Sequence, residues 1–263
     1  MEESKPSRTA LGVALRRASH QIYDSPRIFE DPLAMPIIAR YADRITSDER
    51  MLRLFVAARS RFAEDRLTHA YGAGTRQYVL LGAGLDTFAY RNPHEDLRVF
   101  EVDHPATQAW KRRLIAEAAI AVPASCVYVP VDFEKQKLED RLAAAGFDGN
   151  KPAFFAWLGV VPYLTEEAFR STLAFIASIP RSGVVFDYGT EAARNSPLSA
   201  RVARIGEPFR LFFEPENLHR ELRSFGFGAM EDLGCMEINQ RFGLREENCL
   251  TGTAGRIVWA EKN

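Results

Sequence analysis

The segment QYVLLGAGLDT, residues 77–87, and the segment RVFEVD, residues 98–103, give the clearest structural signal in this chain. Each begins as an apolar run of strand length. The first run ends in Gly-x-Gly. The second ends in an acidic residue about 20 positions later, the spacing at which nucleotide-binding α/β folds place a carboxylate beside a ribose. This order predicts a nucleotide site at the end of a parallel sheet.

The two glycines and the terminal aspartate of these segments have expected roles that follow from backbone conformation and charge. Gly82 and Gly84 allow a tight turn and a close approach to a ligand, because neither has a β-carbon. Asp103 stands at the carboxyl end of the second strand, where its two oxygens can accept hydrogen bonds from two ribose hydroxyls. The alternative for Asp103 is that it caps the helix expected after Pro105.

The same motif argues against a dinucleotide. Such sites use a third glycine for close helix packing and aim a helix N-terminus at a pyrophosphate. Here Thr87 takes the third place and Asp86 precedes it, so a carboxylate would repel a pyrophosphate but favour a cationic ligand. S-adenosylmethionine has a ribose, an ammonium and a sulfonium and no phosphate, so we expect it as the cofactor.

Composition limits the classes of partner. The 263 residues are 46% hydrophobic and 26% charged, which suits a soluble globular protein with one large α/β domain, or such a domain with an appended helical cap. The net charge is −1, which indicates neither a nucleic-acid nor a membrane partner. No apolar stretch approaches the roughly 20 residues of a membrane span. We expect a cytoplasmic protein with a small-molecule partner and no metal site, and the sequence leaves the oligomeric state open.

Hydrophobic periodicity divides the chain into two parts. Residues 1–72 are expected to form an N-terminal helical cap, and residues 73–263 a Rossmann-like domain joined to it as one compact unit. Alternating strands and helices in the second part predict a mostly parallel sheet with helices on both faces. The expected strands are Tyr78–Leu81, Val99–Val102, Val127–Val131, Ala153–Trp157, Val184–Tyr188 and Arg256–Glu261. The expected helices are Pro105–Ala119, Glu134–Ala145, Glu166–Ser178 and Glu216–Phe225.

The motifs LGAGLDTFAYR, VFEVDHP, VPVDFE and PAFFAWLGVVPYLT occur in that order. This series resembles the leucine carboxyl methyltransferase-like family, most closely its bacterial branch, which is associated with O-methylation of polyketides and other secondary metabolites. The resemblance extends from about Ala14 to about Gly228. It implies a class I methyltransferase fold, S-adenosylmethionine as cofactor, and methyl transfer to an oxygen of a small acceptor.

Strand ends and the resemblance together select a cofactor site. In open α/β sheets ligands bind beyond the carboxyl ends of the strands. The expected cofactor-binding residues are Arg59, Gly82, Ala83, Gly84, Asp86, Asp103, His104, Asp132, Phe133, Trp157 and Leu158. By resemblance, Arg59 binds the carboxylate of the cofactor's methionine part. Asp132 and Phe133 could hold adenine, or Asp132 could cap a helix; Arg61 could pair with Asp65 on the surface instead of binding a ligand.

Leu158 is the largest departure from the family pattern. In the eukaryotic members the matching position is a glutamate that helps to bind the cofactor. A leucine cannot accept hydrogen bonds from an ammonium group, so either backbone carbonyls, for example near Gly82 or Trp157, accept them or the cofactor lies differently in this chain. This departure also supports an alternative, a degenerate methyltransferase that binds the cofactor without catalysis. A second alternative, an NAD-dependent oxidoreductase, is disfavoured by Asp86 and Thr87.

The acceptor end shows no obvious general base. The expected acceptor-binding residues are Tyr163, Tyr188, Arg194, Phe209 and Phe212, and the two tyrosines are also the catalytic candidates. A carboxylate acceptor is already ionised at neutral pH and needs no base, whereas a weakly acidic hydroxyl does. The aromatic run around Phe209 indicates either an apolar acceptor pocket or a hydrophobic lid packed on the core. We therefore expect the acceptor to be a carboxylic acid or an acidic hydroxyl on a small apolar or aromatic molecule.

Overall fold

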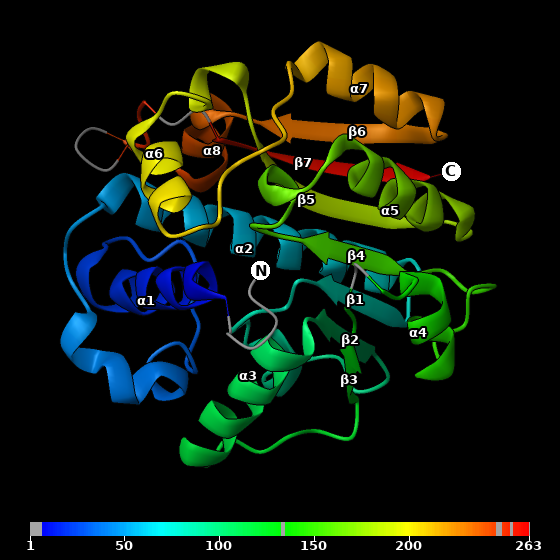
Figure 1. Ribbon diagram of the computed structural model, residues 1–263, viewed down its shortest axis with the longest axis horizontal. Helices are drawn as coiled ribbons and strands as arrows, with labels where there is room; N and C mark the ends of the chain where they lie inside the picture. Colours follow the sequence, from blue (N-terminus) through cyan, green and yellow to red (C-terminus); the bar gives the residue numbers. More distant parts are fainter. Residues whose placement is uncertain (1–6, 133–134, 246–248, 253–254, 263) are drawn as a thin grey trace.

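A computed structural model describes residues 7–132, 135–245, 249–252 and 255–262. A seven-stranded sheet in the order β3-β2-β1-β4-β5-β7-β6 forms the centre of the molecule (Figure 1). The first five strands along the chain pair in parallel, and β7 runs antiparallel to both β5 and β6. The order reverses direction between β1 and β4, and this is the position at which such sheets bind ligands.

The strands largely follow the apolar runs of the sequence. They are β1 (Gln77–Leu81), β2 (Arg98–Asp103), β3 (Cys126–Pro130), β4 (Phe154–Trp157), β5 (Gly183–Gly189), β6 (Phe227–Leu233) and β7 (Gly255–Lys262). The expected mostly parallel sheet is confirmed, and β6 is the strand that sequence reasoning missed. The burial of β6 explains why it was missed. It is an edge strand in which only the two end residues are fully buried, so its sequence has no continuous apolar run.

The helices are α1 (Arg8–Tyr23), α2 (Arg50–Gly72), α3 (Pro105–Glu117), α4 (Leu138–Ala144), α5 (Glu166–Ser178), α6 (Pro197–Arg204), α7 (Pro215–Ser224) and α8 (Cys235–Phe242), with 3-10 turns η1 (Pro36–Arg44), η2 (Phe88–Tyr90), η3 (Val161–Tyr163) and η4 (Glu191–Ala193). The expected start of α4 at Glu134 lies outside the described residues. The hydroxyl of Thr165 caps α5 by accepting from the N–H of Ala168. Helices α6 and α8, which are short, were not among the expected helices.

Alternation along the strands divides the core between the two faces of the sheet. One face packs Phe100, Phe155 and Phe186 against α4, α5 and α7. The other packs Tyr78 and Phe154 against α2 and α8. Helices therefore cover both faces, as the period-two pattern of the strands requires.

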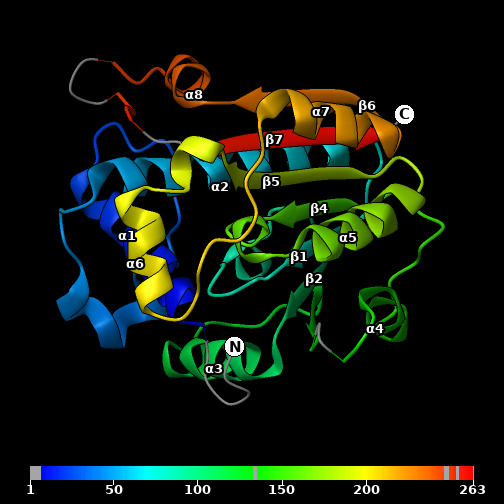
Figure 2. The ribbon, with the colours of Figure 1, turned by 45° about the horizontal axis from the view of Figure 1, so that its top comes forward.

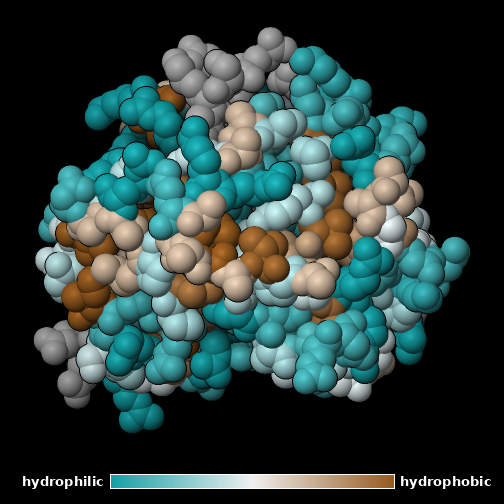
Figure 3. Space-filling model, turned by 90° about the horizontal axis from the view of Figure 1, so that it is seen from below, coloured by the Kyte–Doolittle hydropathy of each residue, from teal (hydrophilic) through white to brown (hydrophobic). Residues whose placement is uncertain are grey.

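Of the N-terminal helical elements, α1 and η1 lie beyond the carboxyl ends of the strands, whereas α2 covers one face of the sheet. Helix α1 and the turn η1 pack with α3 in a third apolar cluster around Trp110 and Leu114. Figures 1 and 2 both place α6 beside α1, although the two helices are far apart in the sequence. Seen from below, most of the surface is hydrophilic, and apolar side chains show mainly in a band across its middle (Figure 3). Among the described residues, no helix has the length and apolar character needed to span a membrane.

Candidate functional site

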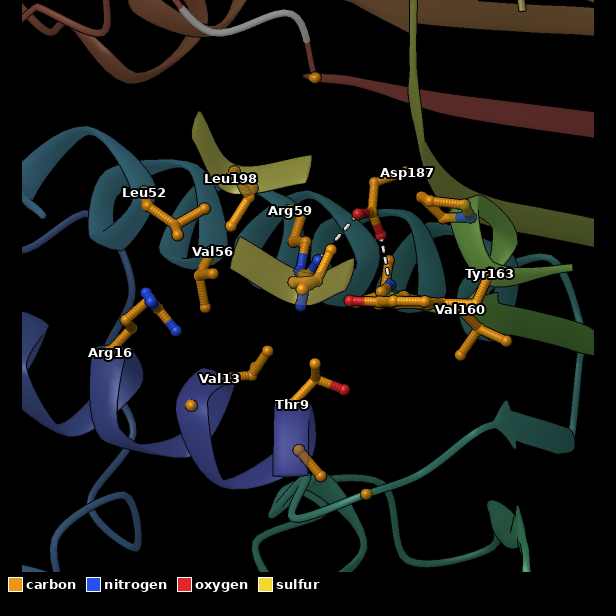
Figure 4. Close-up of a pocket in the computed structure, with 18 of the residues that line it drawn as sticks. Thr9, Val13, Arg16, Leu52, Val56, Arg59, Val160, Tyr163, Asp187 and Leu198 are labelled. Carbon is orange, nitrogen blue, oxygen red and sulfur yellow. Dashed lines mark hydrogen bonds and ion pairs between the residues drawn. The ribbon is translucent and has the colours of Figure 1, made fainter. Parts of the chain in front are cut away.

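A large cavity of about 1870 Å³ opens at the carboxyl ends of the strands. Its wall combines the turn after β1, the ends of β2, β4 and β5, and the helices α1, α2 and α6. Figure 4 shows that Arg59, Asp187 and Tyr163 lie toward the strand ends, whereas Arg16 lies at the opposite end. The cavity is thus built where the strand order predicts a ligand, but part of its wall comes from helices outside the sheet.

The turn after β1 needs its glycines. Gly82 has a φ of 69° and Gly84 a φ of 46°, in the left-handed region that other residues rarely adopt. A β-carbon on Gly82 would come within 2.4 Å of a methyl carbon of Val160. The N–H groups of Gly82 and Ala83 both donate to the carbonyl of Val102, at 2.9 and 3.0 Å. The turn is therefore held against β2 while its backbone faces the cavity.

Asp103 is anchored to that turn. Its carboxylate accepts hydrogen bonds from the N–H of Gly84 at 2.5 Å and from the N–H of His104 at 2.7 Å. Burial raises the pKa of Asp103, and these two backbone hydrogen bonds partly oppose the shift. The N-cap of α3 is His104, whose ring nitrogen accepts from the N–H of Ala106. Asp103 therefore does not cap this helix, and its carboxylate lies on the cavity wall.

Asp86 lines the cavity and is also part of an ionic network. It accepts from Arg17 at 3.3 Å and from the N–H of Phe88 at 2.8 Å. Burial alone would raise the pKa of Asp86, but Arg17, Lys111 and Arg91 outweigh it and the pKa is lowered. Arg17 also donates to the carbonyl of Leu85 at 2.7 Å. Asp86 thus stays ionised and fixes α1 to the turn after β1.

A buried ion pair closes the wall near β4 and β5. A terminal nitrogen of Arg59, on α2, lies 2.8 Å from one oxygen of Asp187, on β5. The other oxygen of Asp187 accepts from the N–H of Gly159 at 2.6 Å. Both side chains are less than a tenth exposed, and both line the cavity (Figure 4). Arg61 instead pairs with Asp65 on the surface at 2.8 Å, as the surface alternative predicted.

The other expected cofactor residues are distributed differently. Leu158 lines the cavity and packs against the apolar core on the α2 side of the sheet. Trp157 is buried in the opposite core, stacked on Phe169 with ring centroids 5.6 Å apart, and does not line the cavity. His104 and Asp132 lie on the wall. Phe133, the expected partner of adenine, lies outside the described residues.

Only part of the expected acceptor set reaches the cavity. Tyr163 and Phe209 line it and meet edge to face, with ring centroids 5.1 Å apart. Burial raises the pKa of Tyr163 to about 12, so its hydroxyl is protonated at neutral pH. Arg194 and Phe212 do not line the cavity; the guanidinium of Arg194 bonds Glu191 and lies 4.3 Å from the centre of the Phe212 ring.

Tyr188 lines the cavity, but its hydroxyl has a structural partner. It donates to Asp232 on β6 at 2.6 Å, and the same carboxylate also binds His219 and Arg256. Burial and the charge of Asp232 raise the pKa of Tyr188 far above its ordinary value. The Tyr163 hydroxyl instead has a hydrogen bond with Thr9, which also lines the cavity, so Tyr163 is the better placed of the two tyrosine candidates.

Helix positions on the wall carried no readable signal in the sequence. Val13 on α1, Leu52 and Val56 on α2 and Leu198 on α6 form an apolar chamber between the two polar ends of the cavity (Figure 4). At its far end Glu49 binds both Arg16, at 2.5 Å, and Arg201. The strand-end rule selects Asp187, near the end of β5, but it does not reach the residues supplied by α1 and α6.

These groups match the parts of an adenosyl amino acid. Asp103 can accept from ribose hydroxyls, and the glycine turn leaves room for a ligand against the backbone. Within the described part of the chain, Arg59 donates one hydrogen bond to Asp187, so its other N–H groups can bind a carboxylate. Asp86 and Asp103 place carboxylates beside the glycine turn, which suits a ligand with positive charge there.

Comparison with known proteins agrees with this chemistry. The family model for leucine carboxyl methyltransferase matches residues 10–177. YktD of Bacillus subtilis, whose name places it among S-adenosyl-L-methionine-dependent methyltransferases, is 33% identical over 283 residues, covering 92% of this chain and 93% of the relative. A Streptomyces coelicolor protein of the same naming is 36% identical over 187 residues, covering 66% of this chain and 65% of its own.

Solved structures share the fold at low identity. A protein of Thermobifida fusca described as a methyltransferase aligns with a TM-score of 0.59 at 17% identity, covering 98% of this chain and 96% of that chain. Magnesium protoporphyrin IX methyltransferase from Synechocystis, solved with bound SAH, aligns with a TM-score of 0.52 at 11% identity, covering 95% and 100%. The chain therefore belongs to the leucine carboxyl methyltransferase family and is an S-adenosyl-L-methionine-dependent methyltransferase.

Proposed function

We propose that this enzyme methylates an oxygen of a small, apolar or aromatic acceptor that reacts as an anion, either a carboxylate or an acidic hydroxyl, as in a polyketide-like acid. The main support is the chamber formed by Val13, Leu52, Val56 and Leu198, which ends in a guanidinium, that of Arg16. An apolar wall with few polar groups favours an apolar ligand body. The charged end favours an acceptor that is an anion.

The charges around Arg16 support an anionic acceptor. Arg16 and Arg201 share one carboxylate, that of Glu49, so this end of the cavity has more positive than negative charge. Burial, and then the nearby guanidinium groups of Arg201 and Arg59, lower the pKa of Arg16 to about 10, which leaves it cationic at neutral pH. An incoming anion would compensate the excess charge, whereas a neutral alcohol or amide would not.

The histidine and tyrosine candidates for a base on the described part of the wall point the same way. Among the described residues that line the cavity, the only histidine is His104, and its Nδ1 already accepts from the N–H of Ala106. Tyr163 has a pKa raised to about 12 by burial, so it donates a hydrogen bond instead of removing a proton. Acceptors that are already ionised need no base.

The residues of the cavity wall would then have distinct roles in binding the cofactor and the acceptor. When S-adenosylmethionine is bound, it supplies a methyl group activated by the sulfonium. Asp103 would hold the ribose, and Arg59 the carboxylate of the methionine part. Tyr163 would orient the acceptor oxygen by donating to it, and the apolar chamber would exclude water. Alignment of two bound reactants accounts for most of the catalysis that such a displacement requires.

Matched acceptors test this proposal. An aromatic or polyketide-like carboxylic acid, its primary amide and its primary alcohol would each be incubated with the enzyme and methyl-labelled cofactor, and products identified by mass spectrometry. We expect a methyl ester from the acid and no product from the amide or the alcohol. The Asp103→Ala variant serves as the control for cofactor dependence. Methylation of the amide nitrogen or of the aliphatic alcohol in preference to the acid would overturn the proposal.

A further inference from the structure

We propose that Asp187 binds the ammonium group of the cofactor's methionine part, a role that Leu158 cannot fill. That part of S-adenosylmethionine is a zwitterion, with one ammonium and one carboxylate on the same carbon. On the cavity wall the structure places one carboxylate and one guanidinium side by side, Asp187 and Arg59, 2.8 Å apart. A paired cation and anion can bind a zwitterion by crossed contacts, each charge facing its opposite.

The contacts of the pair leave room for such binding. A carboxylate has about four lone-pair positions, and Asp187 uses one for Arg59 and one for the N–H of Gly159. These two contacts hold the carboxylate in one orientation on the wall. Gly159 has a φ of 71°, and a β-carbon there would come within 2.9 Å of the Arg59 guanidinium. The glycine therefore allows the guanidinium to lie against this turn.

Position also favours Asp187 over the other acids on the wall. Val160 follows Gly159 and lies against Gly82, since a β-carbon on Gly82 would be 2.4 Å from a Val160 methyl carbon. Asp187 is thus linked through one turn to the glycine backbone where the cofactor is expected. Asp86 instead fixes α1 to the turn through Arg17, and Glu49 lies with Arg16 at the opposite end of the cavity.

Leu158 itself stands next to Gly159 on the same turn. Its side chain packs against the apolar core on the α2 side of the sheet and offers no acceptor. A glutamate at this position and an aspartate at position 187 would therefore present a carboxylate from two neighbouring strands, β4 and β5, to the same region. The inference concerns the cofactor alone and does not depend on the identity of the methyl acceptor.

Asp187 could instead act only by holding Arg59 in place, and three ligands separate the two roles. S-adenosylhomocysteine has both the ammonium and the carboxylate. Its decarboxylated analogue keeps the ammonium and lacks the carboxylate. 5′-Methylthioadenosine lacks both. Calorimetric titration of each ligand into the wild type, Asp187→Asn and Arg59→Ala gives the affinities without any acceptor or turnover.

We expect Asp187→Asn to lower the affinity for S-adenosylhomocysteine and for the decarboxylated analogue by about 10- to 100-fold each, as for a lost charge-assisted hydrogen bond. The affinity for 5′-methylthioadenosine should stay within about threefold of the wild-type value. Arg59→Ala should lower the affinity for S-adenosylhomocysteine but leave the affinity for the decarboxylated analogue within the same threefold limit. Loss of S-adenosylhomocysteine binding in Asp187→Asn with unchanged binding of the decarboxylated analogue would overturn the proposal, because Asp187 would then act only through Arg59.

A charge-relocation variant provides an independent test. Adding Leu158→Glu to Asp187→Asn should restore at least about tenfold of the lost affinity for the decarboxylated analogue. No recovery in a folded double variant would contradict the proposal. If Asp187→Asn does not fold, the wild type can be tested with the N-acetyl derivative of the decarboxylated analogue, which has no charge. The wild type should bind the decarboxylated analogue at least about tenfold more tightly than this derivative. Equal affinities would overturn the proposal.

Discussion

The carboxylate of Asp103 accepts a hydrogen bond from the backbone N–H of Gly84, with a nitrogen–oxygen distance of 2.5 Å. Asp103 ends β2, and Gly84 belongs to the turn after β1. Asp103, the residue proposed to bind the ribose, and the glycine turn therefore form one rigid unit at the switch point of the sheet. A ligand bound to both would be positioned by the sheet itself, and not by a mobile side chain.

Replacing Asp103 should weaken cofactor binding with a defined pH dependence. Asp103→Ala should cost about 2–3 kcal/mol of affinity for S-adenosylhomocysteine, as for lost charge-assisted hydrogen bonds. Because burial raises the pKa of Asp103, protonation begins at a higher pH than for a free aspartate. The affinity of the wild type should thus fall as the pH decreases through that raised pKa, whereas the variant should show no such step. Calorimetry across this range checks both points, and unchanged affinity in a folded variant would assign Asp103 a structural role only.

Gly82 should tolerate no side chain. Gly82→Ala should lower the free energy of unfolding by about 1–3 kcal/mol, because the new β-carbon would overlap Val160. Gly243→Ala is the matched control: its φ of 64° is close to the 69° of Gly82, but no atom lies within 4 Å of the added carbon. Urea unfolding of both variants separates overlap from backbone strain. Adding Val160→Ala should recover part of the loss at Gly82, and equal losses in the two glycine variants would contradict this account.

Two tyrosines should respond differently to loss of the hydroxyl. Tyr163→Phe should reduce single-turnover methyl transfer roughly tenfold, since it removes a protonated donor from the cavity wall. Tyr188→Phe should leave the rate within about threefold but destabilise the fold by about 1–2 kcal/mol, because its hydroxyl donates to Asp232. Rapid-quench kinetics and urea unfolding of both variants make the comparison. A larger rate loss in Tyr188→Phe would reverse the two assignments.

The pH dependence of methyl transfer should follow the acceptor. If the acceptor reacts as an anion that it already contains, the midpoint of the single-turnover rate should move with the acidity of each acid or phenol tested. It should not stay near the ordinary histidine value of about 6.5. Measurement with a series of acceptors of graded acidity decides this. A common midpoint near that value, removed by changing one histidine, would reveal a general base.

Asp24 should stabilise the protein in a pH-dependent way. Burial would raise its pKa, but hydrogen bonds from His20 and Arg53 outweigh burial and lower the pKa from 3.8 to about 2. The stabilisation is therefore present above the unfolded value and is lost as the pH falls through the folded one. Asp24→Asn should cost at least about 2 kcal/mol at neutral pH. Urea unfolding of both proteins should show that this difference shrinks between about pH 4 and about pH 2; a constant difference would contradict the argument.

Local features of the sequence were enough to define the sheet and the cofactor end of the cavity. The glycines at 82 and 84 and the acid at 103 follow apolar runs, and parallel strands bring all their carboxyl ends to one edge. Residue type and spacing therefore placed Gly82, Gly84 and Asp103 on the cavity wall before any contact was known. The same reasoning missed β6, since an edge strand with little burial has no apolar run to mark it.

Only the tertiary structure decided how charges are paired and which aromatic residues face the ligand. Arg59 and Asp187 are 128 positions apart, and nothing in either local sequence names the other. Phe212 and Tyr188 look alike as strand-end or loop aromatics, yet the first packs against Arg194 and the second bonds Asp232. The period and spacing of apolar residues determine which face of an element is buried, because the free energy of that burial depends on residues close together in the sequence. The partner of a polar side chain depends instead on how distant elements pack together.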